Sequence, residues 1–285
     1  MQQAVRTPDR IIASIGDLPA SPVIVSSLMG LTADINSNIQ VIGHTIMADQ
    51  SLTARVLKMA NSSFYGRSKE VHILHEAIVL LGFKTLRSLV VATSTHSLYQ
   101  HVTDERFRTK LWEHTLAVAI GSRTIAAVVD CPQTEEAFLA GLMHDIGKLV
   151  LMQKLPREYG QVTAAVEHGQ GSFHEVETTQ FGFNHAEVGR LLLERWTFPT
   201  VLSETVAAHH RPMAAAESEP LIGIIRLANA LAKHLKVGFD DGRVDDLAML
   251  PATARLGIDI DQLSQIQNRI ETQYQSDRQL FSAGA

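Results

Sequence analysis

Apolar residues recur every three to four positions along most of the chain, which is the spacing of one face of an α-helix. Leu52, Val56 and Leu57 show this spacing in the first third of the chain, and Leu111 and Val118 continue it further on. The alternation of apolar and polar residues that is typical of β-strands is not found over any length. The pattern therefore predicts an all-α protein.

Helix-starting and helix-breaking residues divide this pattern. Pro22 is expected to open an early helix behind the N-cap Ser21, and Gly82 separates two helices that end near residue 100. The first seventeen residues are expected to be irregular, apart from a short helix over residues 8–15, and residues 169–171 to form a turn. Later helices are expected over about 106–129, 137–152, 156–168, 185–196, 199–209, 220–237 and 256–274.

The chain of 285 residues is long enough for roughly two domains, but no Pro/Gly/Ser-rich linker interrupts it between Leu98 and Leu111. We therefore expect an N-terminal helical layer over residues 1–105 that packs directly on a helical core over 106–240. Residues 241–285 would form a C-terminal helical tail. The expected fold is an all-α helical bundle with the N-terminal layer packed on it.

Composition excludes several classes of protein. The net charge is −5 and no run of Lys and Arg is present, which argues against non-specific binding of nucleic acid. Cys131 is the only cysteine, so an intramolecular disulfide and a thiolate metal cluster are excluded. Neither a secretory signal nor an apolar run of about 20 residues is visible, so we expect a cytoplasmic protein without membrane spans. The 13 histidines are the one compositional excess.

The stretch over residues 141–152 is the most informative part of the chain. It reads as a buried helix with His144 and Asp145 side by side in its middle. A buried carboxylate without a partner costs several kcal/mol, on the order of the penalty for burying an unpaired polar group. Asp145 must therefore meet a divalent cation, an Arg, a Lys or a second His.

Other histidines stand where a metal ligand could. His114 lies on the apolar stripe of the helix over 106–129, and His209 and His210 lie at a helix end. His185 follows the predicted N-cap Asn184, and the positive end of that helix is expected to keep its imidazole neutral. Imidazole and carboxylate together suit Fe, Mn, Zn, Ni or Co, in a site with one ion or two.

Each of these residues also has a plain structural interpretation. A lone buried histidine such as His114 is more often bonded to a backbone carbonyl, and Asn229 could be a buried amide bonded to the backbone. The co-occurrence of His114, His144, Asp145, His185, His209 and His210 in one half of the chain favours a shared site. The remaining histidines have polar or loop settings and are set aside: His44, His72, His75, His96, His101, His168, His174 and His234.

At this point the sequence resembles a known family. His114, then His144-Asp145 in the context His-Asp-Ile-Gly-Lys, and then Asn229 resemble the HD superfamily of metal-dependent phosphohydrolases. His185 and the pair His209-His210 resemble its binuclear branch, which includes the HD-GYP cyclic dinucleotide phosphodiesterases. The resemblance is closer still to the HDOD family, and it covers about residues 18–236. The motifs that carry it are residues 49–62, 77–82, 181–189 and 208–212.

The sequence departs from the HD pattern at two places. Asn229 stands where the superfamily has an Asp, which removes one negative charge and supplies a poorer ligand. After His210 the chain continues Arg-Pro-Met-Ala without a Gly-Tyr-Pro segment, which argues against cleavage of cyclic dinucleotides.

The resemblance implies two alternative functions. The favoured one is an HDOD-type regulatory module in signal transduction, which binds a signalling protein or a phosphorylated small molecule, with or without a metal. The alternative is a metal-dependent phosphohydrolase in which Asp145 and Lys148 are catalytic, Lys148 facing a phosphate. His114, His144 and Asp145, with Asn229, would then hold a first metal, and His185, His209 and His210 a second. The oligomeric state stays open.

Overall fold

The computed structural model describes residues 7–14, 43, 46, 47, 50–61, 71–211, 220–239 and 246–282, and no strand occurs among them. Its helices are α1 (Pro8–Ser14), α4 (Gln50–Ala60), α5 (Leu74–Tyr99), α6 (Glu105–Val128), α7 (Thr134–Met143), α8 (Ile146–Lys154), α9 (Pro156–Glu167), α10 (Phe173–Phe181), α11 (His185–Arg195), α12 (Thr200–Ala208), α13 (Pro220–His234), α14 (Pro251–Arg255) and α15 (Ile260–Ser282). The predicted all-α fold is confirmed. The N-cap Ser21 and the early helix that Pro22 was expected to open lie outside the described residues.

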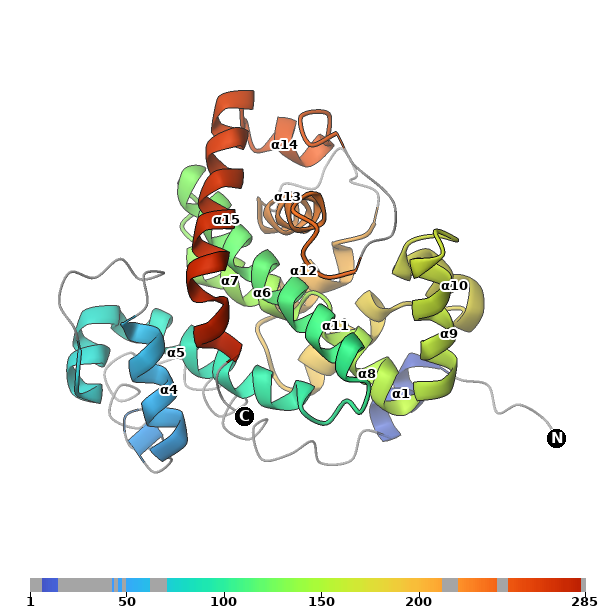
Figure 1. Cartoon of the computed structure of the whole chain (residues 1–285), viewed down its shortest axis with the longest axis horizontal. Coiled ribbons are helices and arrows are strands. Elements are labelled where there is room, and N and C mark those ends of the chain that lie inside the picture. Colours follow the sequence, from blue (N-terminus) through green and yellow to red (C-terminus); the bar gives the residue numbers. More distant parts are fainter. Residues whose placement is uncertain are drawn as a thin grey trace.

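Helix α6 runs through the middle of the molecule and packs against α7, α13 and α15 (Figure 1). Small residues allow the close approach. A Cβ added to Gly141 would lie 2.8 Å from the Cα of Ala119, and one added to Gly121 would lie 3.3 Å from the Cβ of Ala228. Helices α7 and α13 are therefore the ones that approach α6 at its small residues.

The N-terminal layer packs on this core through α5. This helix is kinked at Gly82, whose φ of 73° and ψ of 167° are not helical, so the predicted break is confirmed. The part of α5 after the kink contacts α7, and Leu89, Val91 and Leu98 belong to the same hydrophobic core as residues of α6 to α15. In Figure 1 helix α4 and the start of α5 extend to the left, away from α9 and α10.

The helix expected over 137–152 is in fact two helices, α7 and α8, which meet at His144 and Asp145. Asp145, with φ −103° and ψ 9°, has left the helical conformation. Just after the break α8 packs closely against α11, where a Cβ added to Gly147 would overlap the carbonyl oxygen of His185. The break thus places His144 and Asp145 at a helix junction, where both side chains reach one site.

Helix α10 was not expected from the sequence. Ser172 caps it, and the backbone N–H of Ser172 donates to Glu175 Oε2 at 2.8 Å, as in a capping box. The predicted turn precedes it, with positive φ at Gly169 and Gly171. The end of the chain also differs from the expected helix over 256–274, since α14 stops before Gly257 and α15 runs from Ile260 to Ser282.

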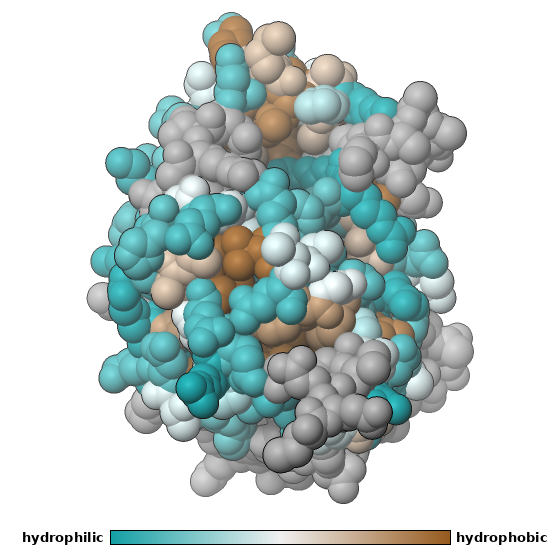
Figure 2. Space-filling view, turned by 90° about the vertical axis from the view of Figure 1, so that its right-hand side faces the viewer, coloured by the Kyte–Doolittle hydropathy of each residue, from teal (hydrophilic) through white to brown (hydrophobic). Residues whose placement is uncertain are grey.

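The surface that faces right in Figure 1 is largely hydrophilic. Hydrophobic side chains gather there in small patches, mainly near the centre of the view and bordered by polar residues (Figure 2). None of the helices in the described ranges is both long enough and apolar enough to span a bilayer.

Candidate metal centre

Asp145 lies at the centre of a cluster of imidazole rings, and its side chain is 1% exposed. Its Oδ2 lies 3.3 Å from His144 Nε2 and 3.7 Å from His114 Nε2. Its Oδ1 lies 3.1 Å from His185 Nε2 and 3.9 Å from His209 Nε2. These residues come from α6, the junction of α7 and α8, α11 and the end of α12, so the bundle brings together side chains that are far apart in the sequence.

Three of these rings contact a backbone carbonyl through Nδ1. A carbonyl can only accept, so each Nδ1 carries a proton, and in the neutral ring the lone pair is on Nε2, the nitrogen that faces Asp145. The structural interpretation, a histidine bonded to a carbonyl, and the ligand interpretation are therefore compatible, because each uses a different ring nitrogen. The contacts are His114 to Val237 at 3.2 Å, His144 to Gly141 at 2.7 Å and His209 to Val206 at 2.6 Å.

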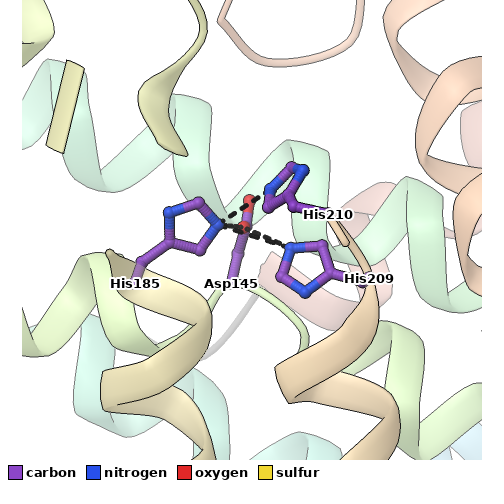
Figure 3. Close-up of side chains that lie close together, drawn as sticks. All are labelled: Asp145, His185, His209 and His210. Atoms are coloured by element: carbon purple, nitrogen blue, oxygen red, sulfur yellow. Dashed lines mark hydrogen bonds and ion pairs between the residues drawn. The ribbon is translucent and has the colours of Figure 1, made fainter. Parts of the chain in front are cut away.

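The second side of the cluster joins α11 to the end of α12. His185 Nε2 lies 3.1 Å from His210 Nε2 and 3.4 Å from His209 Nε2, with Asp145 between the rings (Figure 3). Arg226 of α13 donates to the carbonyl oxygen of Ala208 at 2.6 Å and so fixes the end of α12. Two groups of candidate ligands share Asp145: His114, His144 and Asp145 in one, and Asp145, His185, His209 and His210 in the other.

The residues fit a cation. Asn229 Oδ1 is a buried atom without a hydrogen-bond partner among the described residues, while Asp145 Oδ1 and His144 Nε2 have only other members of the cluster within reach. Leaving a buried donor or acceptor unsatisfied costs about 1–3 kcal/mol. All three atoms can donate a lone pair, and Asp145 and Asn229 line the same cavity. This set of one carboxylate, one amide oxygen and several imidazoles suits a divalent transition metal.

The protonation states also suit metal binding. Burial would raise the pKa of Asp145, but His144 and Lys148 outweigh it and hold that pKa well below its usual range. Burial lowers the pKa of His114 to about 3, and it lowers the pKa values of His209 and His210 well below the usual value. At neutral pH the carboxylate is therefore charged and these imidazoles are neutral, as ligands must be.

The pKa of His185 shifts upward, in the opposite direction to the pKa values of His114, His209 and His210. Asn184 does cap α11, accepting from the N–H groups of Ala186 and Glu187. Burial lowers the pKa of His185, yet the net shift is upward because the Glu177 carboxylate lies 2.6 Å from Nδ1. The contact with the Glu177 carboxylate, a full charge, thus opposes the effect of the helix N-terminus, and the expected neutral state of this ring stays a prediction.

Lys148 forms an ion pair with Asp145. Its Nζ lies 2.7 Å from Asp145 Oδ2 and 4.4 Å from the centre of the Phe173 ring. Its expected contact with a phosphate stays a prediction. The cavity beside it measures about 30 Å³ and is lined by His114, Asp145, Lys148, Ser172, Phe173, His210, Asn229, Lys233 and Phe239. Because one water needs about 10–15 Å³, this is room for an ion and a small ligand atom or water.

A short segment after α13, residues 237–239, covers the cavity. Gly238 adopts a φ of +100°, and a Cβ on it would lie 2.6 Å from the Cβ of His114. The Phe239 ring packs 5.1 Å from Phe173 and 5.2 Å from Phe107, measured between ring centres. Glycine at 238 thus lets the backbone pass directly over His114.

Sequence reasoning missed two side chains beside the cluster. Glu177 lies on α10, and a search for the Ser172–Glu175 capping box would have found that helix, although not the contact with His185. His174 had been set aside, but its ring stacks on His210 with the centres 4.8 Å apart. Of the other histidines set aside, His96 packs against Trp112 in the core.

Comparison with known proteins places the chain. It is 27% identical over 238 residues to an uncharacterised protein of Treponema pallidum (strain Nichols), covering 79% of the chain but only 45% of that protein. An HDOD domain protein from Geobacter sulfurreducens has a TM-score of 0.84 and 24% identity, covering 96% of both chains.

Two further solved structures share the fold. A candidate phosphohydrolase from Shewanella amazonensis SB2B has a TM-score of 0.76 and 26% identity, covering 96% of this chain and 98% of that one. A candidate signal transduction protein from Marinobacter aquaeolei VT8 has a TM-score of 0.75 and 21% identity, covering 99% of this chain and 61% of that one. The family model of the HDOD domain matches residues 18–212, and the chain belongs to the HDOD domain family.

Proposed function

We propose that this chain is a metal-binding HDOD module that acts in signalling rather than in catalysis. The observation that carries the proposal is the convergence of buried imidazole nitrogens on the carboxylate of Asp145. His114, His144, Asp145 and Asn229 would hold one ion. His185, His209 and His210, again with Asp145, would hold a second.

Charge favours a small anion as the further ligand. Among the described residues, Asp145 is the one carboxylate that lies directly in the cluster, and the amide of Asn229 adds no charge. A divalent ion would therefore keep excess positive charge, to which Lys148 and Lys233 at the cavity wall add. A phosphorylated small molecule, or a phosphate group on a partner protein, is the ligand chemistry that complements this site.

The small size of the cavity supports a regulatory role. A volume of about 30 Å³ under the rings of Phe173 and Phe239 admits only one end of a ligand beside the cluster, such as an oxygen of a phosphate group. The fold relative from Marinobacter aquaeolei is itself described as a candidate signal transduction protein. We propose that occupancy of this cavity is what a partner protein senses.

A phosphohydrolase is the second candidate. The intact His-Asp pair favours it, as does the relative from Shewanella amazonensis described as a candidate phosphohydrolase. A bound divalent ion would supply Lewis-acid chemistry there. Of the chain's own residues, Asp145 would bind the ion, as a member of both groups of candidate ligands. Lys148 would stabilise negative charge that develops on a phosphoryl group.

Elemental analysis of the purified full-length chain, with the same sample assayed on p-nitrophenyl phosphate, tests the proposal. We expect bound transition metal and no hydrolysis above that of Asp145→Asn, a variant that should lose the metal. The exposed His101 supplies a matched control, since His101→Ala should keep the metal. Absence of metal after incubation with Mn, Fe, Co, Ni or Zn salts would overturn the proposal. Hydrolysis that Asp145→Asn abolishes would replace it with the phosphohydrolase.

A further inference from the structure

Glu177 is a fully buried carboxylate on α10 that contacts the cluster from behind His185. Its Oε2 accepts from both the backbone N–H of His185, at 2.7 Å, and the ring Nδ1 of the same residue, at 2.6 Å. Its Oε1 accepts from the hydroxyl of Tyr159 at 2.5 Å. Both the Glu177 and the His185 side chains are 0% exposed. Three donors therefore hold the carboxylate, and two of them belong to one histidine.

The other rings around Asp145 are held differently. His114, His144 and His209 each use a backbone carbonyl as the partner of Nδ1. A neutral carbonyl is sufficient to fix the orientation of a ring, and it avoids the desolvation penalty of a buried charge, which is several kcal/mol. Orienting the ring does not require the Glu177 carboxylate at His185, so this carboxylate is expected to have a second effect on the ring.

A carboxylate partner changes the donor strength of an imidazole. When Nδ1–H donates to a carboxylate, electron density shifts toward Nε2, and the ring becomes a more basic ligand. The His185 ring also separates the negative charge of Glu177 from the place where a cation would bind. It thus compensates in part for the charge that Asn229 lacks, while leaving the cavity itself uncrowded.

We propose that Glu177 is a positioning residue that makes His185 the strongest imidazole donor of the cluster. The inference rests on the proposed function, because it assumes that the cluster binds a divalent ion. Tyr159 keeps Glu177 in place, and the Tyr159 ring is itself fixed by edge contact with Phe107, 5.6 Å between centres. These contacts hold the side chains of Tyr159, Glu177 and His185 in place without a bound ion.

A double-mutant cycle on metal affinity tests the proposal with the full-length chain. Zn²⁺ or Co²⁺ is titrated into metal-free wild type, Glu177→Gln, His185→Gln and the double variant. We expect Glu177→Gln to weaken binding about 10- to 100-fold, the usual effect of losing such an outer carboxylate. In the His185→Gln background the same substitution should have little further effect, because its influence passes through that ring.

A matched control is available in Glu135, another buried carboxylate, which pairs with Arg123 at 3.1 Å. Glu135→Gln should leave metal affinity unchanged. Tyr159→Phe keeps the carboxylate and should weaken binding less than Glu177→Gln does, so it remains informative if Glu177→Gln fails to fold. Thermal unfolding of each metal-free variant shows which of them fold.

Three outcomes would contradict the inference, and they can be told apart. Equal affinity of wild type and Glu177→Gln, or of wild type and Tyr159→Phe where Glu177→Gln does not fold, overturns the role of Glu177 while the metal site stands. The role of Glu177 is also overturned if Glu177→Gln lowers metal affinity as much in the His185→Gln background as in wild type. Glu177 would then affect metal binding only through the fold. A wild type that binds no metal refutes the proposed function, and the inference falls with it.

Discussion

Single residues decide the charge of this site, and Asn229 is the clearest case. Its Oδ1 is buried without a partner among the described residues and lines the cavity with Asp145. The HD pattern places an Asp here, whose charge would balance a cation more fully. The amide therefore sets how strongly the site can hold an ion and how much positive charge it retains for an anion.

Asn229→Asp should raise the affinity for a divalent metal by about tenfold or more, which corresponds to ~1.4 kcal/mol. The two side chains have nearly the same shape, so packing should not change. Without metal the variant should melt at a lower temperature, because a second carboxylate beside Asp145 raises the pKa of one of them at the cost of stability. Added metal should restore the melting temperature by mass action.

Asn229→Leu is the matched variant, which removes the amide oxygen at similar size and should weaken metal binding. Melting of metal-free and metal-loaded samples by calorimetry measures both effects. A loss of stability in Asn229→Asp that none of the metals reverses would show that the cluster is not a metal site.

At the scale of elements, the junction of α7 and α8 places His144 and Asp145 in the site. This junction could not be predicted from the sequence. The helix over 106–129 was predicted almost to the residue, since its apolar stripe is long, and in the structure Asp104 caps it. The break at His144 was not predicted, because the apolar spacing continues through it, and the close packing of Gly147 on His185 is a tertiary contact. The approach of Glu177 to His185 likewise depends on how α10 packs, which no local pattern encodes.

Gly147→Ala should destabilise the protein by about 3 kcal/mol or more, because the new Cβ would meet backbone that cannot move easily. Gly160 in α9 is the matched control, since a Cβ there would have nothing within 4 Å. Gly160→Ala should be neutral or stabilising by up to about 1 kcal/mol. Urea unfolding of both variants measures the difference, and equal stabilities would contradict the contact between α8 and α11.

At the scale of the whole molecule, one hydrophobic core extends from the N-terminal layer into the helical core. Ile11 and Ile12 of α1 and Leu98 of α5 belong to it together with residues of α6 to α15. At its edge Arg87 of α5 also pairs with Glu136 of α7 at 3.4 Å. The boundary expected after residue 105 falls at the start of α6, inside this shared core.

Because the core is shared, thermal unfolding of the full-length chain should follow a single transition. Circular dichroism at 222 nm and tryptophan fluorescence should give the same midpoint, since Trp112 and Trp196 are both buried in this core. Two separate transitions would show that the N-terminal layer and the helical core fold independently.

Stability should also fall at alkaline pH. Burial raises the pKa of Tyr99, and burial together with Glu177 raises the pKa of Tyr159 well above the ordinary value. The folded state therefore holds these protons more tightly than the unfolded state, so stability is full below about pH 10 and declines above it. Absorbance at 295 nm should show Tyr99 and Tyr159 ionising only as the chain unfolds. Ionisation of both near pH 10 in the folded chain would contradict this.

The segment over residues 237–239 contacts both the ring of His114 and the cavity beside it. Val237 holds the ring of His114 through its carbonyl, and Phe239, two residues on, closes the cavity. If a ligand enters past Phe239, the movement that admits it also displaces Val237, the partner of His114. Access to the cavity and the orientation of His114 would then be coupled, and an ion held here would exchange no faster than this segment opens. Residence time, rather than affinity alone, would then be the quantity that a partner protein can adjust.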